Sequence, residues 1–130
     1  MKSLSTAFTI GIAALMSGSV THAHHSTAMY DMGKTVELEG TLRKVQISNP
    51  HSWFFVVVTN ASGVEETWAL EGASAAETGR RTGGGNTKEY FAAGQKVKIS
   101  LHPVRDGRTT GELLRMSFAD GRNFGGGSNP

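Results

Sequence analysis

The sequence predicts an all-β domain with one short helix, a five-stranded OB-like β-barrel that follows a cleavable signal peptide. Apolar and polar residues alternate with a period of two in separate segments between residues 35 and 119, which indicates strands with one buried face. A helix signature separates the third segment from the fourth, and the first segment is long and interrupted by Gly40. Three strands, a helix and two further strands follow the order of an OB fold. An open β-sandwich fragment is the alternative architecture.

Residues 1–23 have the pattern of a secretory signal peptide. Lys2 precedes an apolar run over residues 7–16, and the segment ends in small residues up to Ala23. The apolar run is about ten residues long, which is too short for the roughly 20 residues of a membrane-spanning helix. We therefore expect cleavage after Ala23, a mature chain that begins at His24 and has no membrane span, and a periplasmic or secreted location.

The first three strands are expected over residues 35–48, 53–58 and 64–71. In the first of them the inward phase shifts by one residue after Leu42, and such a slip beside Gly40 predicts a β-bulge. The second is a dense run of β-branched and aromatic residues, which predicts a strand buried on both faces for part of its length. The three strands form a meander.

A short helix is expected over residues 74–81. Ser74 is its N-cap, and the glutamate three residues later completes a capping box. Residues 86–94 are expected to form a loop, in which Tyr90 and Phe91 plug the open end of the core.

The fourth and fifth strands are expected over residues 97–102 and 111–119. The inward side chains of the fifth strand are Leu114, Met116 and Phe118. The barrel domain therefore covers residues 24–122, and residues 123–130 are expected to form a flexible Gly-rich tail.

The composition excludes several classes of function. The chain has 130 residues, no Cys, and 13 Lys and Arg against 11 Asp and Glu, for a formal net charge of +2. Without Cys there is no disulfide, no thiolate metal site and no cysteine nucleophile. So small an excess of positive charge is no nucleic-acid footprint. The sequence has neither a nucleophile elbow nor a phosphate-binding loop. We therefore expect no enzyme, with a copper redox activity as the weaker alternative.

Four histidines remain after cleavage, and each lies at a break or an end of the strand pattern. They are His24, His25, His51 and His102. A terminal His24 offers its α-amine and its imidazole Nδ1 in one chelate, and a third nitrogen from another histidine completes a set that suits Cu(II). Met29 and Met32 add soft sulfur for Cu(I). The sequence therefore predicts a site for a copper ion, or for another divalent transition metal, at these four histidines.

The alternative function is a non-catalytic interaction module. In this interpretation the histidines are solvated and incidental, and the barrel face or its loops bind an envelope protein or a small envelope ligand. The two hypotheses differ in whether the histidines converge, because ligating nitrogens lie near 2 Å from a metal ion.

Short motifs along the chain resemble those of a known family. They are His24-His25-Ser26, Tyr30-Asp31, Glu39-Gly40-Thr41, Asn49-Pro50-His51-Ser52-Trp53, Gly94-Gln95-Lys96-Val97, His102-Pro103-x-Arg105-Asp106-Gly107 and Ala119-Asp120-Gly121. With these motifs the chain resembles the DUF6152 family of small exported bacterial proteins over residues 24–122. The resemblance implies a secreted Gram-negative protein of unknown function, and it marks His24, His25, His51 and, to a lesser degree, His102. Residues 82–87 depart from the family's pattern, which has a tryptophan-containing segment after the short helix.

Overall fold

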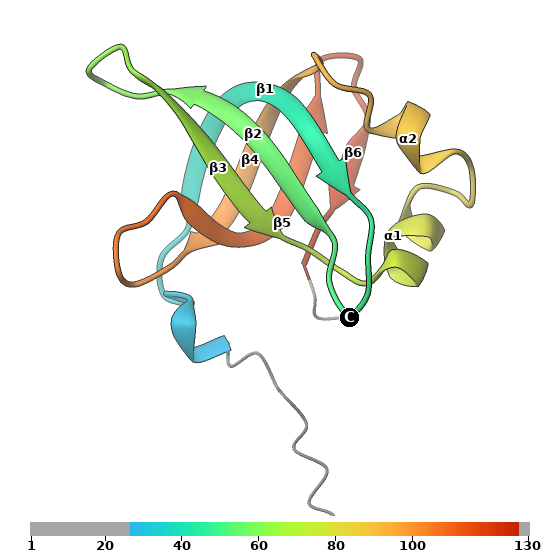
Figure 1. Cartoon of the computed structure of the whole chain (residues 1–130), viewed down its shortest axis with the longest axis horizontal. Coiled ribbons are helices and arrows are strands. Elements are labelled where there is room, and N and C mark those ends of the chain that lie inside the picture. The colour runs from blue at the N-terminus through green and yellow to red at the C-terminus, as the bar shows by residue number, and fades with distance from the viewer. Residues whose placement is uncertain (1–26, 128–130) are drawn as a thin grey trace, which may run out of the picture.

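The computed structural model describes residues 27–127, which contain six strands and three short helices (Figure 1). The strands are β1 (Val36–Gln46), β2 (Trp53–Thr59), β3 (Glu65–Glu71), β4 (Lys96–Pro103), β5 (Thr110–Phe118) and β6 (Asn123–Gly125). The helices are the 3-10 turn η1 (Thr27–Met29), α1 (Ala75–Arg81) and α2 (Thr87–Tyr90). The expected signal peptide, His24 and His25 lie outside the described residues.

The strands close into an OB-like barrel. Their hydrogen-bonded order is β3-β2-β1-β4-β5-β6, and an additional pairing of β3 with β5 closes the sheet. That closing contact is parallel and short, Ala69–Glu71 against Thr110–Glu112, whereas the other strand pairs are antiparallel. Both α-helices lie between β3 and β4 in the chain. The predicted all-β, five-stranded OB-like barrel is confirmed, and closure removes the exposed edges of its sheet.

β1 bends where the sequence predicted an irregularity. Its first half pairs with β4 up to Thr41, and its second half pairs with β2 from Thr41 onward. The register shifts between Leu42 and Lys44, which is the predicted bulge. Gly40 stands at the bend because a Cβ there would lie 2.3 Å from the carbonyl oxygen of Val57. Only glycine permits this close approach of two backbones.

α1 begins as predicted. The Ser74 hydroxyl accepts a hydrogen bond from the backbone N–H of Glu77 at 3.3 Å, as an N-cap does. The Glu77 carboxylate pairs with Arg80 and Arg81, and hydrogen bonds from these two residues hold the pKa of Glu77 below its ordinary value. Helix α1 ends at Arg81.

Two details of the strand pattern differ from the predictions. β2 alternates between buried and half-buried side chains, so it is fully buried on one face and not on both, as Phe54 and Phe55 illustrate. On β5, Leu113 is fully buried and Leu114 is only half-buried. The reason is a register shift in the β4–β5 pairing next to Leu101, which moves the inward phase by one residue at that end of the strand.

Two expected loop segments are in fact ordered elements. Residues 87–90 form α2, whose N-cap Asn86 accepts a hydrogen bond from the backbone N–H of Lys88 at 3.1 Å. Residues 123–125 form β6, which pairs with β5, so the expectation of a tail from residue 123 is wrong for this stretch. Phe124 explains β6, because its side chain is buried in the core.

Aromatic side chains fill the barrel interior at the side that the helices cover (Figure 1). The rings in contact are those of Phe54, Tyr90, Phe91, Phe118 and Phe124. The predicted plug by Tyr90 and Phe91 is confirmed. Arg122 lies over the rings of Tyr90 and Phe118, at 4.6 and 4.3 Å from their centroids. Over residues 27–127, no helix has the length and apolar character that crossing a membrane requires.

Candidate functional site

Two glutamates are buried on the outer side of the barrel wall. Glu71 on β3 follows Leu70, and Glu112 on β5 precedes Leu113; successive side chains of a strand point to opposite faces. Leu70 and Leu113 lie in the core, so the glutamates point away from it. Glu71 and Glu112 are nevertheless only 6% and 4% exposed. They are directly opposite each other in the parallel β3–β5 pairing.

The chain before β1 covers this pair of glutamates. Tyr30 forms an isolated bridge with Val104, and the next residue's N–H donates to the carbonyl of Pro103 at 2.8 Å. The N–H of Arg105 in turn donates to the carbonyl of Met29 at 3.1 Å. Figure 1 shows the resulting arrangement, with the blue N-terminal segment beside the loop between β4 and β5. Tyr30 is thereby held in a buried position.

Tyr30 donates its phenol hydrogen to Oε2 of Glu71. Burial raises the pKa of the Tyr30 phenol, and the hydrogen bond to Glu71 and the charges of Glu71 and Glu112 raise it further. The phenol therefore keeps its proton across the physiological range and remains a donor. Its hydrogen bond to a carboxylate ties the N-terminal segment to the barrel wall.

His51 reaches the same carboxylate from the β1–β2 loop. The Ser48 hydroxyl donates to the carbonyl of His51 at 2.7 Å, which fixes the loop. Nδ1 of His51 lies 3.2 Å from the carbonyl oxygen of Gly72, and Nε2 lies 3.3 Å from Oε1 of Glu71. A carbonyl only accepts, so Nδ1 carries the proton of this hydrogen bond. We call Tyr30, His51, Glu71 and Glu112 the outer polar cluster.

His102 borders the outer polar cluster. It is paired with Glu112 in the β4–β5 register, so the two side chains share a face of the sheet. Its Nδ1 lies 2.8 Å from the carbonyl oxygen of Lys34 and donates to it, which secures the N-terminal segment a second time. His51 and His102 thus both bind a backbone carbonyl through Nδ1.

The four histidines of the predicted metal site have different outcomes. His51 and His102 lie on the same outer face of the barrel, whereas His24 and His25 fall outside the described residues. Between residues 27 and 127, no group of three or more His, Cys, Asp or Glu side chains is arranged to hold a metal ion. The expected sulfur ligands Met29 and Met32 are 38% and 45% exposed, beside Tyr30.

Sequence reasoning missed Glu71 and Glu112. The alternation of β3 assigned Glu71 to the solvent side, and no local signal says that a distant segment covers that side. In the sequence, Tyr30 stands out only as part of the Tyr30-Asp31 motif and as a residue that could pack on the barrel. Tyr30 lies between the histidine pair and the first strand. That position was the one signal for a contact with the outer side of the barrel.

His51 also lines a small pocket of about 250 Å³. Pro50 and Ser74 line it, together with the Glu77, Arg80 and Arg81 side chains of α1. His51 therefore both contacts the buried Glu71 and borders this pocket.

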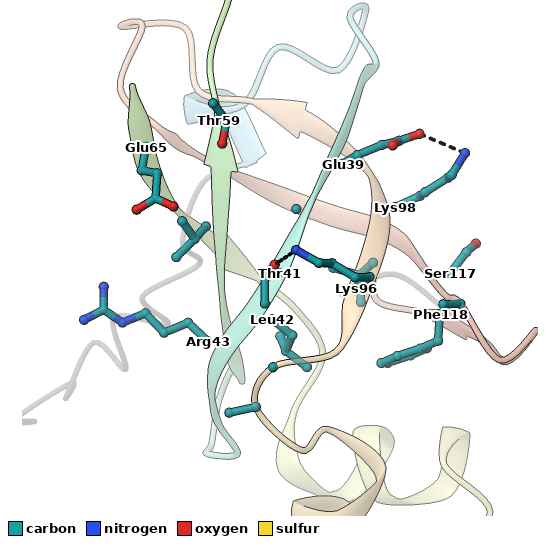
Figure 2. Close-up of a pocket in the computed structure, with 16 residues that line it drawn as sticks. Glu39, Thr41, Leu42, Arg43, Thr59, Glu65, Lys96, Lys98, Ser117 and Phe118 are labelled. Carbon is teal, nitrogen blue, oxygen red and sulfur yellow. Dashed lines mark hydrogen bonds and ion pairs between the residues drawn. The ribbon is translucent and has the colours of Figure 1, made fainter. Parts of the chain in front are cut away.

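A larger groove of about 820 Å³ runs across β1 (Figure 2). Lys96 donates from Nζ to Oγ1 of Thr41 at 2.8 Å, and Lys98 pairs with Glu39 at 2.8 Å. Figure 2 shows Arg43 on the opposite side of β1 from the two lysines. Arg43 is exposed and forms no ion pair with any residue from 27 to 127.

The chain matches the model of a family of unknown function, DUF6152, over residues 13–114. The matched range contains Tyr30, His51, Glu71 and Glu112, as well as the histidine pair before them. No curated protein and no solved structure matches the chain. A match over most of the chain, together with the motifs at residues 24–26 and 49–53, means that the protein belongs to the DUF6152 family.

Proposed function

We propose that the protein is exported and binds a divalent transition metal ion, copper first, through its mature N-terminus and His51. The α-amine and imidazole of His24 form the chelate, and His51 supplies the nitrogen from the barrel. His25 and His102 are the further nitrogen ligands at hand. The observation that carries this proposal is that Tyr30 and His51 contact the same buried carboxylate of Glu71.

The anchoring of Tyr30 supports the proposal through chain length. His24 precedes Tyr30 by six residues, and a fully extended chain of six residues spans at most about 20–22 Å. Because Tyr30 and His51 meet at Glu71, a chain that begins six residues before Tyr30 is long enough to reach His51. The anchoring of Tyr30 also lowers the entropy cost of bringing the terminal nitrogens to the barrel.

The hydrogen bond of His51 to Gly72 supports the proposal because it orients the ring for metal binding. Ligating histidines usually donate one ring N–H to a carbonyl or carboxylate, which orients the ring and directs the other nitrogen at the metal. Nδ1 of His51 donates to Gly72 in this way, so Nε2 is the ligating nitrogen. Among the described residues, no three potential ligands converge on one point. In this proposal, the two nitrogens of His24 complete the set.

The experiment uses exported protein whose N-terminus is identified by mass spectrometry. We expect the mature chain to start at His24 and to bind about one equivalent of Cu(II) in a competitive titration. One Ala inserted before His24 should weaken binding at least about 100-fold, since the amine and imidazole no longer form one chelate. An extra Ala after Pro130 is the matched control and should change nothing. Equal affinities of the two extended proteins would contradict the proposal.

A second candidate function is the binding of a small anionic envelope ligand in the groove of Figure 2. The volume of about 820 Å³ lies within the range of small-molecule sites, and Arg43, Lys96 and Lys98 outnumber Glu39 and Glu65 along it. Titration with inorganic phosphate should shift the amide NMR signals of residues 39–43 and 96–98. Arg43→Gln should abolish those shifts and Arg115→Gln should not; shifts spread over the whole surface would contradict specific binding.

A further inference from the structure

His51 directs both of its ring nitrogens at acceptor oxygens. Nδ1 lies 3.2 Å from the carbonyl oxygen of Gly72, and Nε2 lies 3.3 Å from Oε1 of Glu71. A neutral imidazole has one N–H and can donate to only one of these two acceptors. A metal ion bound between Nε2 and Oε1 satisfies the second contact.

The spacing of the two atoms suits a shared metal ion. Zn²⁺ bonds to His nitrogen at about 2.0–2.1 Å and to carboxylate oxygen at about 2.0–2.2 Å. Two such bonds at a tetrahedral angle place nitrogen and oxygen about 3.3–3.5 Å apart, and a square-planar angle places them about 2.9 Å apart. The observed 3.3 Å falls in this range, so a metal ion fits with little movement of either side chain.

Tyr30 directs the carboxylate. Its phenol occupies Oε2 of Glu71, so Oε1 is the oxygen that faces His51. The Glu71 side chain is 8% exposed, which leaves little water to compete for Oε1. Outer hydrogen bonds of this kind hold a ligand in place and raise metal affinity.

The charge of the cluster also favours a divalent cation. Glu112 lies directly opposite Glu71 in the β3–β5 pairing, and both are buried. Two adjacent buried carboxylates are costly, and a nearby positive charge offsets the cost. A dipositive ion bound to Glu71 supplies such a charge.

We propose that Oε1 of Glu71 binds the same metal ion as Nε2 of His51, and that Tyr30 is the positioning residue that aims this oxygen. This inference rests on the proposed function. It adds an oxygen to the nitrogens of His24 and His51, and a set of nitrogen and carboxylate oxygen donors favours a borderline divalent ion such as Cu(II) or Zn(II) over Cu(I).

The test compares four exported proteins: the wild type, Glu71→Gln, Tyr30→Phe and Glu112→Gln. Glu71→Gln should lower Cu(II) affinity about ten- to 100-fold and change the g and hyperfine values of the Cu(II) EPR spectrum, because an anionic oxygen ligand is lost. Tyr30→Phe should lower affinity about tenfold. Glu112→Gln removes a neighbouring buried charge but no ligand, so it should lower affinity only modestly and keep the wild-type EPR spectrum.

The outcomes separate this inference from the proposed function. Wild-type affinity and an unchanged EPR spectrum in both Glu71→Gln and Tyr30→Phe would mean that Glu71 is not a ligand, and would overturn the inference while copper binding stands. A wild type that binds no Cu(II) would overturn both. If Glu71→Gln does not fold, Glu71→Asp shortens the reach by one methylene and tests the same bond, with the same EPR change expected.

Discussion

Leu70 and Glu71 are neighbours on β3, and Leu113 and Glu112 are neighbours on β5, yet the two faces of these strands have opposite surroundings. The leucines are fully buried in the barrel interior with the aromatic rings, whereas the glutamates are buried outside the wall beneath Tyr30. Burial of apolar area stabilises the fold directly. Burial of carboxylates costs free energy unless partners compensate it. The interior therefore explains why the chain folds, and the outer polar cluster is where to look for what it binds.

The largest loss of stability should come from a substitution in the barrel interior. Phe124→Ala removes a ring that contacts Phe54, Tyr90 and Phe91, and it should lower the free energy of unfolding by about 3–5 kcal/mol. Urea denaturation measures this. Cu(II) affinity of the folded fraction should stay at the wild-type value, because the outer polar cluster lies on the other face of the wall. A parallel loss of affinity would mean that the two faces are not independent.

Tyr30→Phe should have the next largest effect on stability. It removes a hydrogen bond to a buried carboxylate and keeps the ring, and such bonds contribute about 1.5–3 kcal/mol. The matched control is Tyr90→Phe, whose ring belongs to the interior aromatic group. Urea midpoints should fall for Tyr30→Phe and change little for Tyr90→Phe. Equal midpoints for all three proteins would show that the outer cluster does not hold the N-terminal segment.

High pH should weaken the contribution of Tyr30 to stability. The folded protein raises the pKa of Tyr30 above the value of about 10 in the unfolded chain. Above pH 10 the unfolded chain loses this proton while the folded protein keeps it, so unfolding releases a proton and stability falls with rising pH. Below pH 10 the contribution is fully present. Metal-free wild type should therefore lose stability faster between pH 10 and 11 than Tyr30→Phe, and equal slopes would contradict this.

The smallest loss of stability should come from a substitution of His102, which borders the outer polar cluster. His102→Leu removes the hydrogen bond to the carbonyl of Lys34 and should lower the free energy of unfolding by about 0.5–1 kcal/mol. Limited proteolysis should cut the segment before β1 faster in this variant. A matched Ser117→Ala change, far along the barrel, should leave the proteolysis rate unchanged.

The interior could be predicted from the sequence because alternation depends only on near neighbours in the chain. The bulge after Leu42 was predicted by the phase slip in the alternation beside Gly40. β6 was missed because its glycines suggested a tail, and only the tertiary burial of Phe124 orders it. Leu113 was missed because the register shift makes Leu114 the extra residue of β5, which the alternation along the strand does not reveal.

The outer polar cluster could be predicted only in part. His51 was found because a histidine in an Asn-Pro-His loop is an unusual feature. Glu71 was not, because the residue that covers it, Tyr30, is 41 positions away in the chain. Cover from so distant a segment leaves no periodic trace on β3 itself.

The most direct test of a metal site in the outer polar cluster is anomalous diffraction at the copper edge from crystals of Cu(II)-loaded exported protein. One peak is expected within about 2.3 Å of both Nε2 of His51 and Oε1 of Glu71, since ligand bonds to such ions are about 2.0–2.2 Å long. Loaded protein without a peak at that place, with His51 still in contact with Glu71, would contradict it.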